Sequence, residues 1–431
     1  MSSKTNTTAT KEEARPALVP KLRFQEFRGA EGWPQESGDS LFDQINDRNS
    51  EPGLPVLAIT QEHGAIPRHM IDYHVSVTEK SIESYKVVGV GDFIISLRSF
   101  QGGIEYSRYH GICSPAYVIL RRRGKGSDEY FRHYLKTDRF IRILTKNLEG
   151  LRDGKMISYA QFSELRLPTP KPAEQQKIAD CLSSVDELMA AQARKVDALK
   201  THKKGLMQQL FPREGETQPR RRFPEFQNAS EWEETSFGRV LKISSGKGFK
   251  ASEYSKTGIR LLQIENVGYG STKWSENTSY LPESYATEYP ELVLRGGDIV
   301  LALNRPVTND ELKIAKIQHH EPIAILYQRV GRLEFLDDSL QVDFAFHVCR
   351  QFIKEFVVEK SIGSDQPFIS LKDLYSQSFR LPGPAEQQRI ATCLSSLDAL
   401  ITAETQKLEA LKTHKKGLMQ QLFPSPEEVA A

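Results

Sequence analysis

Residues 172–212 read PAEQQKIADCLSSVDELMAAQARKVDALKTHKKGLMQQLFP, and residues 384–424 read PAEQQRIATCLSSLDALITAETQKLEALKTHKKGLMQQLFP. The two tracts differ at 11 of 41 aligned positions, whereas the segments before them share far less. A shorter repeat extends the duplication, because residues 24–27 (FQEF) with Trp33 correspond to residues 223–226 (FPEF) with Trp232. The chain therefore reads as globular segment, helix, globular segment, helix, with a nearly constant tract after each of two divergent segments.

Each tract carries apolar residues at alternating spacings of four and three, a period that keeps one stripe facing a partner helix. The stripe predicts a helix of about 35 residues and about 50 Å. Pro172 and Pro384 suit its first turn, and Pro212 and Pro424 close it. The predicted coiled-coil seam consists of Ile178, Leu182, Val185, Met189, Val196 and Leu199 in the first tract and of Ile390, Leu394, Leu397, Ile401, Leu408 and Leu411 in the second.

We expect the two helices to pair with each other, because the stripe is too narrow and too long for one small domain. Packing of each helix on its own globular segment is the alternative. Copies related by a pseudo-two-fold axis perpendicular to their length must run antiparallel. Gln192 and Glu404 then fall near the middle of the seam, where a polar pair fixes the register. Gly205 and Gly417 each cost about 1 kcal/mol relative to alanine, which favours either a close backbone contact or a frayed last turn.

The globular segments mix short β-branched and aromatic runs with glycine and aspartate, which indicates α+β folds. Predicted strands are 54–60, 92–97 and 116–120 in the first segment and 260–264, 298–303 and 323–326 in the second. Predicted helical stretches are 128–147 and 342–359. The expected organisation is a disordered leader (1–19), a first globular domain (20–170), a helix (171–212), a second globular domain with a short linker (213–382), a helix (383–424) and a tail (425–431).

Both globular segments contain the order glycine, aspartate, apolar run, polar loop, at 91–98 (GDFIISLR) and 297–305 (GDIVLALNR). Arginine, asparagine and glutamine on such a loop can each form two hydrogen bonds with a guanine or adenine edge. A second polar segment precedes each long helix, at 150–158 and 361–370. Two roles remain possible for it: a contact with DNA phosphates, or a simple turn before a serine that caps a short helix. The candidate DNA contacts are Arg98, Ser99, Gln101, Arg108, Arg152, Lys155, Asn304, Arg305, Thr308, Lys313, Ser364 and Gln366.

Sequence signals for other functions are missing. There is no apolar run long enough to span a bilayer, no GxxxxGK[ST] phosphate loop and no nucleophile with a matching base. Cys113, Cys181, Cys349 and Cys393 form no CxxC pair, which indicates reduced thiols in a cytoplasmic protein and no metal site. The net charge of +2 gives no sign of nucleic-acid binding, and the basic runs 121–125 and 220–222 are expected to be solvated surface. The chain reads as a non-catalytic binding subunit.

In these features the chain resembles the specificity (S) subunits of type I restriction-modification enzymes over nearly its whole length. The resemblance rests on the P-x-E-Q-Q-x-I-A tracts at 172–179 and 384–391 and on the shared helix ending KKGLMQQLFP. Residues 91–117 and 304–331 match recognition-domain segments more loosely. The resemblance implies that each globular segment is a target-recognition domain that reads one half of a bipartite double-stranded DNA sequence.

The resemblance also implies partners and their cofactors. Two modification subunits, which carry S-adenosylmethionine, would dock on the repeated helices, and restriction subunits would bring ATP- and Mg-dependent translocase and nuclease activities. The assembled complex would be an adenine methyltransferase and an ATP-dependent endonuclease in the cytoplasm, and this chain would itself bind no cofactor. Two alternatives stay open: a coiled-coil adaptor whose globular domains bind proteins, and a chain with its own nuclease or methyltransferase activity.

Overall fold

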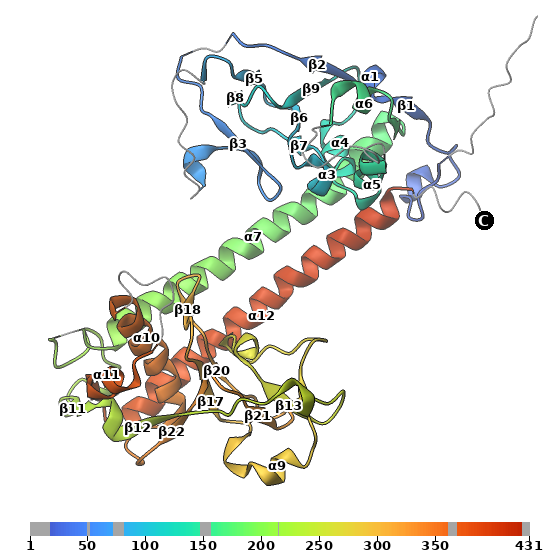
Figure 1. Ribbon diagram of the computed structural model, residues 1–431. Helices are drawn as coiled ribbons and strands as arrows, with labels where there is room; N and C mark the ends of the chain where they lie inside the picture. The colour runs from blue at the N-terminus through green and yellow to red at the C-terminus, as the bar shows by residue number, and fades with distance from the viewer. Residues whose placement is uncertain are drawn as a thin grey trace, which may run out of the picture. The chain divides into compact units, whose positions relative to one another are not determined.

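The computed structural model describes residues 18–49, 52–71, 82–146, 157–213, 215–360 and 369–424. The chain forms two compact units, unit 1 (Met1–Arg194 with Thr405–Ala431) and unit 2 (Lys195–Glu404). Each boundary between the units falls within a long helix, α7 (Pro172–Leu210) or α12 (Pro384–Leu422). Each unit therefore combines one globular part, the first half of the helix that follows it and the second half of the other helix (Figure 1).

Unit 1 is an α+β structure around a four-stranded antiparallel sheet. Its strand order is β2 (Phe42–Ile45), β9 (Val118–Arg122), β6 (Phe93–Ile95) and β7 (Glu105–Tyr106). Smaller strand pairs in the described part of unit 1 are β1 (Gln35–Ser37) with β10 (Arg166–Pro168), β3 (Leu57–Thr60) with β4 (Gly64–Pro67), and β5 (Lys86–Val88) with β8 (Gly111–Cys113). All three residues of β6 are buried, which explains why this strand is a continuous apolar run instead of an alternating one.

Among the described residues, the globular part of unit 1 contains the α-helices α1 (Gly38–Leu41), α3 (Ser99–Gly102), α4 (Asp128–Tyr134), α5 (Asp138–Lys146) and α6 (Tyr159–Ser163). The helical stretch predicted over 128–147 is thus divided into α4 and α5. The break has a tertiary cause, because the carbonyl oxygen of Leu135 accepts a hydrogen bond from the amide of Ile104 at 3.2 Å. Thr137 then starts the next helix, since its Oγ1 accepts from the amide of Phe140 at 3.2 Å.

Unit 2 contains two larger sheets. One has the order β12 (Leu241–Ser245), β22 (Val330–Phe335), β17 (Ile299–Ala302), β20 (Ile314–Lys316) and β14 (Tyr269–Gly270). The other has the order β15 (Tyr280–Leu281), β13 (Ile259–Leu262), β21 (Ala324–Leu326) and β16 (Val293–Leu294). The remaining pairs are β11 (Glu233–Ser236) with β23 (Ser378–Leu381) and β18 (Val307–Thr308) with β19 (Glu311–Leu312). The helices are α8 (Phe237–Val240), α9 (Tyr285–Glu288), α10 (Val342–Lys360) and α11 (Leu371–Ser376).

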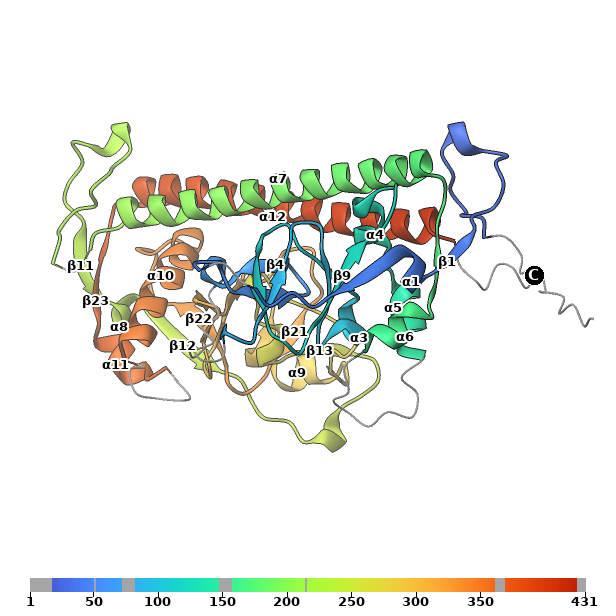
Figure 2. The same ribbon diagram turned by 90° about the horizontal axis from the view of Figure 1, so that it is seen from above.

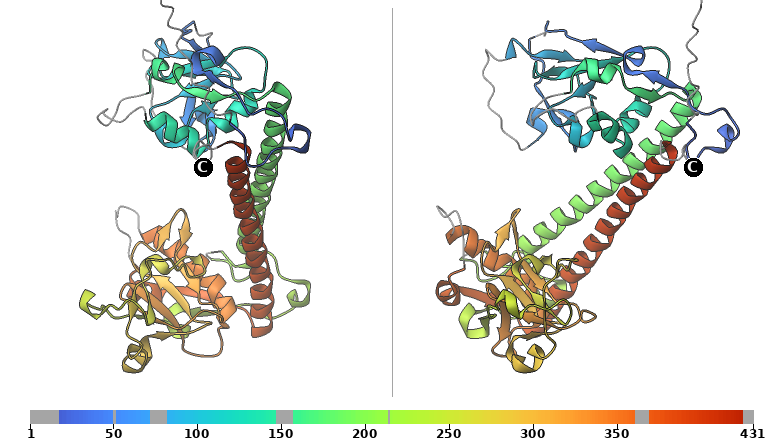
Figure 3. Two further views of the ribbon diagram at one scale, coloured as in Figure 1. Left: turned by 90° about the vertical axis from the view of Figure 1, so that its right-hand side faces the viewer. Right: turned by 45° about the vertical axis from the view of Figure 1, so that its right-hand side comes forward.

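The long helices run antiparallel, as predicted. In unit 1, Leu422 near the end of α12 lies in the same buried cluster as Ile178 near the start of α7. In unit 2, Met207 near the end of α7 lies in one cluster with Ile390 near the start of α12. Figures 2 and 3 show the two helices, green and red, next to each other in further views. The first turns of each helix therefore pack both on their own globular part and on the other helix, so the two packing modes weighed from the sequence occur together.

Gly205 and Gly417 have no heavy atom within 4 Å of the position that a Cβ would take, so of the two alternatives the close backbone contact is wrong for the described residues. Replacing either glycine by alanine is therefore expected to raise the free energy of unfolding by about 1 kcal/mol, because a helical glycine carries an entropic cost without a compensating contact. Urea titration monitored by circular dichroism measures the change. Gly103→Ala is the opposite control, since Gly103 has φ of 80° and a Cβ there would lie 2.1 Å from the carbonyl oxygen of Leu135. A loss of stability in the helix variants would show that these positions carry a contact.

Candidate nucleic-acid interface

The repeated glycine-aspartate motif forms the same turn in both units. Gly91 and Gly297 have φ of 93° and 98°, a conformation that favours glycine. Asp92 and Asp298 each accept a hydrogen bond from the backbone amide three residues earlier, at 2.7 Å in both units. The motif thus fixes where β6 and β17 begin, and with them the position of the loops that follow these strands.

In unit 1 the loop after β6 presents some of the candidate residues and turns one of them inward. Arg98 and Gln101 are exposed, and Phe100 between them is 40% exposed. Ser99 is buried, and its Oγ accepts from the amide of Ser96 at 2.9 Å. Ser99 therefore holds the loop in place, while Arg98 and Gln101 face solvent where a ligand can approach.

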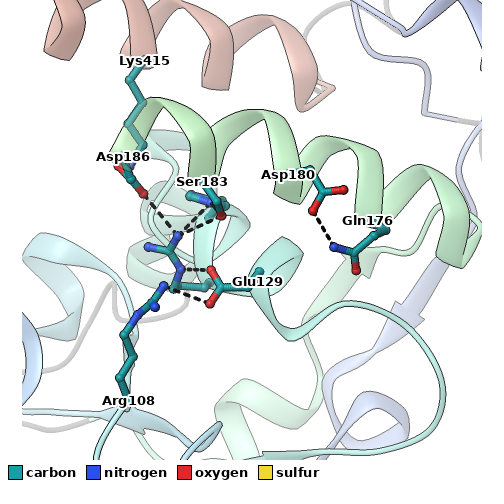
Figure 4. Close-up of polar contacts among 9 residues, drawn as sticks. Arg108, Glu129, Gln176, Asp180, Ser183, Asp186 and Lys415 are labelled. Carbon is teal, nitrogen blue, oxygen red and sulfur yellow. Dashed lines mark hydrogen bonds and ion pairs between the residues drawn. The ribbon is translucent and has the colours of Figure 1, made fainter. Parts of the chain in front are cut away.

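Arg108 lies between β7 and β8 with its side chain 62% exposed. Its guanidinium donates to Glu129 of α4 at 3.0 Å (Figure 4). The side chain is accordingly oriented by the protein and still open to solvent.

In unit 2 the loop after β17 presents Asn304 and Arg305, both exposed. Arg305 has φ of 46°, a left-handed conformation that costs a non-glycine residue roughly 1–2 kcal/mol. Such strain is most often retained at functional positions. The loop continues into the β18–β19 hairpin, whose two turn residues, Asn309 and Asp310, have φ of 53° and 57°. Positive φ at both positions is typical of a tight two-residue turn, so the hairpin carries Thr308 on a well-defined support.

Two further candidates in unit 2 differ in availability. Thr308 is exposed, and its hydroxyl shares a 2.6 Å hydrogen bond with the hydroxyl of Tyr269. Lys313 instead donates its Nζ to the carbonyl oxygen of Ile264 at 2.8 Å, and burial lowers the pKa of this ammonium group. Lys313 is therefore half-buried, and its ammonium group holds a neighbouring loop.

Four candidates, Arg152, Lys155, Ser364 and Gln366, lie outside the described residues. Ser158 and Ser370, which follow them in the sequence, cap short helices, which is one of the two roles predicted for these segments. Ser158 accepts from the amide of Gln161 at 3.2 Å and begins α6, and Ser370 accepts from the amide of Asp373 at 3.4 Å and begins α11.

Five of the seven cations in the two basic runs (121–125 and 220–222) pair with carboxylates of their own unit, a feature that the sequence did not reveal. The ion pairs are Arg121 with Asp92, Arg122 with Asp128, Arg123 with Asp43, Arg220 with Glu216, and Arg222 with Glu386. These arginines support loops and strand ends, so the basic runs are poor candidates for a free phosphate-binding surface.

The glutamate of each P-x-E-Q-Q tract anchors the start of its long helix. Arg23 donates to both oxygens of Glu174, at 2.7 and 2.8 Å, and Arg222 donates to Glu386 at 2.9 and 2.5 Å. Both carboxylates are 3% exposed. The hydrogen bonds to glutamate raise the pKa of Arg23 and of Arg222. These two ion pairs were not predicted, although an arginine precedes each repeated phenylalanine in the sequence.

The first glutamine of the tract closes the joint between the globular part and the helix. In unit 1, Gln175 donates to the carbonyl oxygen of Pro170 at 2.8 Å and accepts from the amide of Ser127 at 3.1 Å. In unit 2, Gln387 makes the corresponding bond to Pro382 at 2.9 Å. Each long helix is thereby fixed in direction relative to the globular part that precedes it.

Half of the twelve seam residues are buried, and all of these except Val196 lie toward the helix starts. Ile178, Leu182, Val185, Val196, Ile390 and Leu394 are buried, and Met189, Leu199, Leu397, Ile401, Leu408 and Leu411 are partly exposed. Glu404 is buried and pairs with Lys195 at 3.0 Å. Each unit also has one lysine–aspartate pair between the helices, Lys415 with Asp186 at 2.6 Å in unit 1 and Lys203 with Asp398 at 2.5 Å in unit 2.

Within the described ranges, no helix is long and apolar enough to cross a membrane. Across the same ranges, no group of three histidine, cysteine, aspartate or glutamate side chains could hold a metal ion.

The comparisons with known proteins agree with this geometry. The family model described as type I restriction modification DNA specificity domain matches residues 40–201 and 229–413. The type I restriction enzyme MjaVIII specificity subunit of Methanocaldococcus jannaschii is 34% identical over 355 residues, which cover 81% of each chain.

Two solved structures have a similar fold at 17% sequence identity. One is the S subunit of a type I restriction-modification system from M. genitalium, with a TM-score of 0.54 over 95% of this chain and 100% of that one. The other comes from work on complex assembly and conformational transition of the type I R-M system, with a TM-score of 0.50 over 91% and 95%. Since the family model matches both halves and a relative above 30% identity spans most of the chain, the protein belongs to the family of type I restriction-modification DNA specificity subunits.

Proposed function

We propose that this specificity subunit reads a bipartite double-stranded DNA sequence, with one half-site for each unit. The observation that carries the proposal is the repetition of one construction: a glycine-aspartate turn leads into a buried strand that ends in exposed polar side chains. Direct base contacts are assigned to Arg98 and Gln101 in unit 1 and to Asn304 and Arg305 in unit 2, because these side chains are exposed on the two equivalent loops. The domain ranges 20–170 and 213–382 are proposed as the two readers.

Affinity is expected to come from phosphate contacts and from partner subunits, and specificity from these loops. A net charge of +2 on 431 residues supplies little non-specific attraction to DNA. The isolated subunit should therefore bind DNA weakly. The adaptor alternative is disfavoured by the family membership.

The finer assignments concern the complex. We propose that two modification subunits dock on α7 and α12 and supply S-adenosylmethionine, and that restriction subunits supply the ATP- and Mg-dependent activities. In this arrangement the chain is non-catalytic and acts in the cytoplasm. Two exposed leucines at equivalent positions of the tracts support docking on the helices: Leu188 is 58% exposed and Leu400 is 40% exposed.

Alanine at Leu188 or at Leu400 is expected to weaken binding of one modification subunit about fivefold, because truncating an apolar contact at an interface costs about 1 kcal/mol. Titration calorimetry with the purified modification subunit measures the affinity and the number of sites. Val358→Ala is the control, since Val358 is 51% exposed on α10 and has no counterpart in the repeat. If all three variants bind the modification subunit with equal affinity, Leu188 and Leu400 are not part of the docking surface.

The proposed function is tested by producing the chain with its modification subunit and mapping methylated adenines in genomic DNA. A single bipartite motif with a fixed gap is the expected result. An assembled, S-adenosylmethionine-binding complex that methylates no defined motif would contradict DNA reading by this chain and favour the adaptor.

A further inference from the structure

Each unit contains a series of ion pairs that links a candidate DNA-contact residue, or the hairpin that carries one, with both long helices. In unit 1, Arg132 of α4 donates to Asp186 of α7 at 3.2 Å, and Lys415 of α12 donates to the same carboxylate at 2.6 Å. Arg132 also pairs with Glu129, which orients the exposed Arg108 at 3.0 Å (Figure 4). An exposed candidate for DNA contact is thus connected to the helix pair through two carboxylates and one arginine.

Unit 2 repeats this series with other residues. Arg350 of α10 donates to Glu311 at 2.9 Å and lies 3.7 Å from Asp398 of α12, an ion pair longer than a hydrogen bond. Glu311 is in the hairpin that carries Thr308, where the two residues face each other in register. Lys203 of α7 donates to both oxygens of Asp398, at 2.5 and 2.6 Å, and its side chain is only 8% exposed. A buried ammonium group needs such a partner, because leaving it unpaired is costly.

The two aspartates occupy equivalent positions of the repeated tract, but the arginines that reach them do not. Arg132 precedes His133 by one residue, whereas Arg350 follows His347 by three. The two histidines occupy equivalent positions relative to the long helices. Each ring forms a hydrogen bond with the serine hydroxyl three residues before the aspartate, at 3.3 Å for His133 and 2.9 Å for His347. Burial lowers the pKa of His133 to about 2 and of His347 to about 4, so neither ring supplies the positive charge. The carboxylate is therefore kept in both units while its arginine has changed position.

We propose that Asp186 and Asp398 are positioning residues for DNA reading. Asp186 holds α4 of unit 1 against the long helices, and Asp398 holds α10 of unit 2. Each carboxylate thereby fixes the angle at which the candidate residues of its own unit meet the bases. This inference rests on the proposed function. An apolar stripe tolerates small rotations and shifts, whereas a carboxylate shared by cations from two different elements has a narrow range of favourable geometries. Base contacts need side chains placed to within about 0.5 Å. Loss of one carboxylate should therefore weaken discrimination between correct and incorrect bases in one half-site and leave base discrimination in the other half-site unchanged.

The test uses the complete chain assembled with modification subunits. Methylation rates are measured on a duplex with the wild-type motif and on duplexes with each single-base substitution in either half. Asp186→Asn is expected to lower the ratio of correct to substituted rates about tenfold in one half, and Asp398→Asn in the other half. Asp186→Glu, which keeps the charge but moves the carboxylate by one methylene, should restore the ratio only in part. Asp180→Asn is the matched control on the same helix, because Asp180 bonds Gln176 of that helix at 2.7 Å (Figure 4).

The Tm of each variant distinguishes positioning from stability. If the variants lose discrimination in both halves in proportion to a lower Tm, or if they keep full discrimination, the carboxylates only stabilise the fold and the inference is wrong. A wild-type complex without any bipartite motif would overturn the proposed function and this inference with it. The wild-type arm of the experiment therefore separates the two failures.

Discussion

Glu386→Ala is expected to lower the free energy of unfolding by about 3 kcal/mol, because breaking one partner of a buried ion pair leaves an uncompensated charge. The carboxylate is 3% exposed and the guanidinium of Arg222 is 7% exposed. Arg222 keeps its bonds to the carbonyl oxygens of Ala229 and Ser230, at 3.1 and 3.2 Å, which places the loss at the lower end of the range for buried pairs. Urea denaturation followed by circular dichroism and tryptophan fluorescence measures the change.

The control for this variant is Glu225→Gln. Glu225 pairs with Arg389, which lies on α12 as Glu386 does. Both side chains are 47% exposed, so solvent screens the pair and little change in stability is expected. Glu174→Ala should repeat the large loss in unit 1, where Arg23 occupies the place of Arg222. Equal and small effects of the buried and exposed substitutions would contradict the anchoring role of the tract glutamates.

Arg305→Ala is expected to reduce methylation of the recognised sequence up to about 100-fold, because a two-bond contact between arginine and guanine contributes about 1–3 kcal/mol. Arg305→Gly should reduce reading equally while keeping or raising stability, since glycine tolerates the φ of 46° without strain. Single-turnover methylation measured beside thermal unfolding separates the two effects.

Arg295→Ala is the charge-matched control for Arg305. Arg295 is also exposed, but it precedes β17 whereas Arg305 follows it. Methylation is expected to stay near the wild-type rate in this variant. If Arg295→Ala and Arg305→Ala reduce the rate alike, general electrostatic attraction to DNA explains both, and Arg305 reads no base.

The sequence predicted the long helices well because their determinants are local and repeated. The 3.5-residue period, the flanking prolines and the duplicated tract give helices of 39 residues each, close to the predicted length. The buried strands β6 and β17 were also visible, since a short apolar run after glycine and aspartate has few other interpretations.

Side-chain direction could not be predicted in the loops. Ser99 and Lys313 have the same polar character as Arg98 and Thr308, yet they bond to the backbone of their own unit. Only tertiary structure decides this difference. The break between α4 and α5 is similar, because it depends on a hydrogen bond from Ile104, a residue distant in sequence.

The order in which the chain segments of the two units are synthesised has a consequence for folding. Unit 2 is one continuous segment, Lys195–Glu404, whereas unit 1 consists of two segments, one on each side of unit 2 in the sequence. The ring of Phe423 lies 5.5 and 5.6 Å from the rings of Tyr130 and Tyr134, in the core of unit 1. At about 5–20 residues per second, the ribosome adds Phe423 roughly 10–50 s after the globular part of unit 1 is complete. The aromatic core of unit 1 is therefore completed only after all of unit 2 has been synthesised.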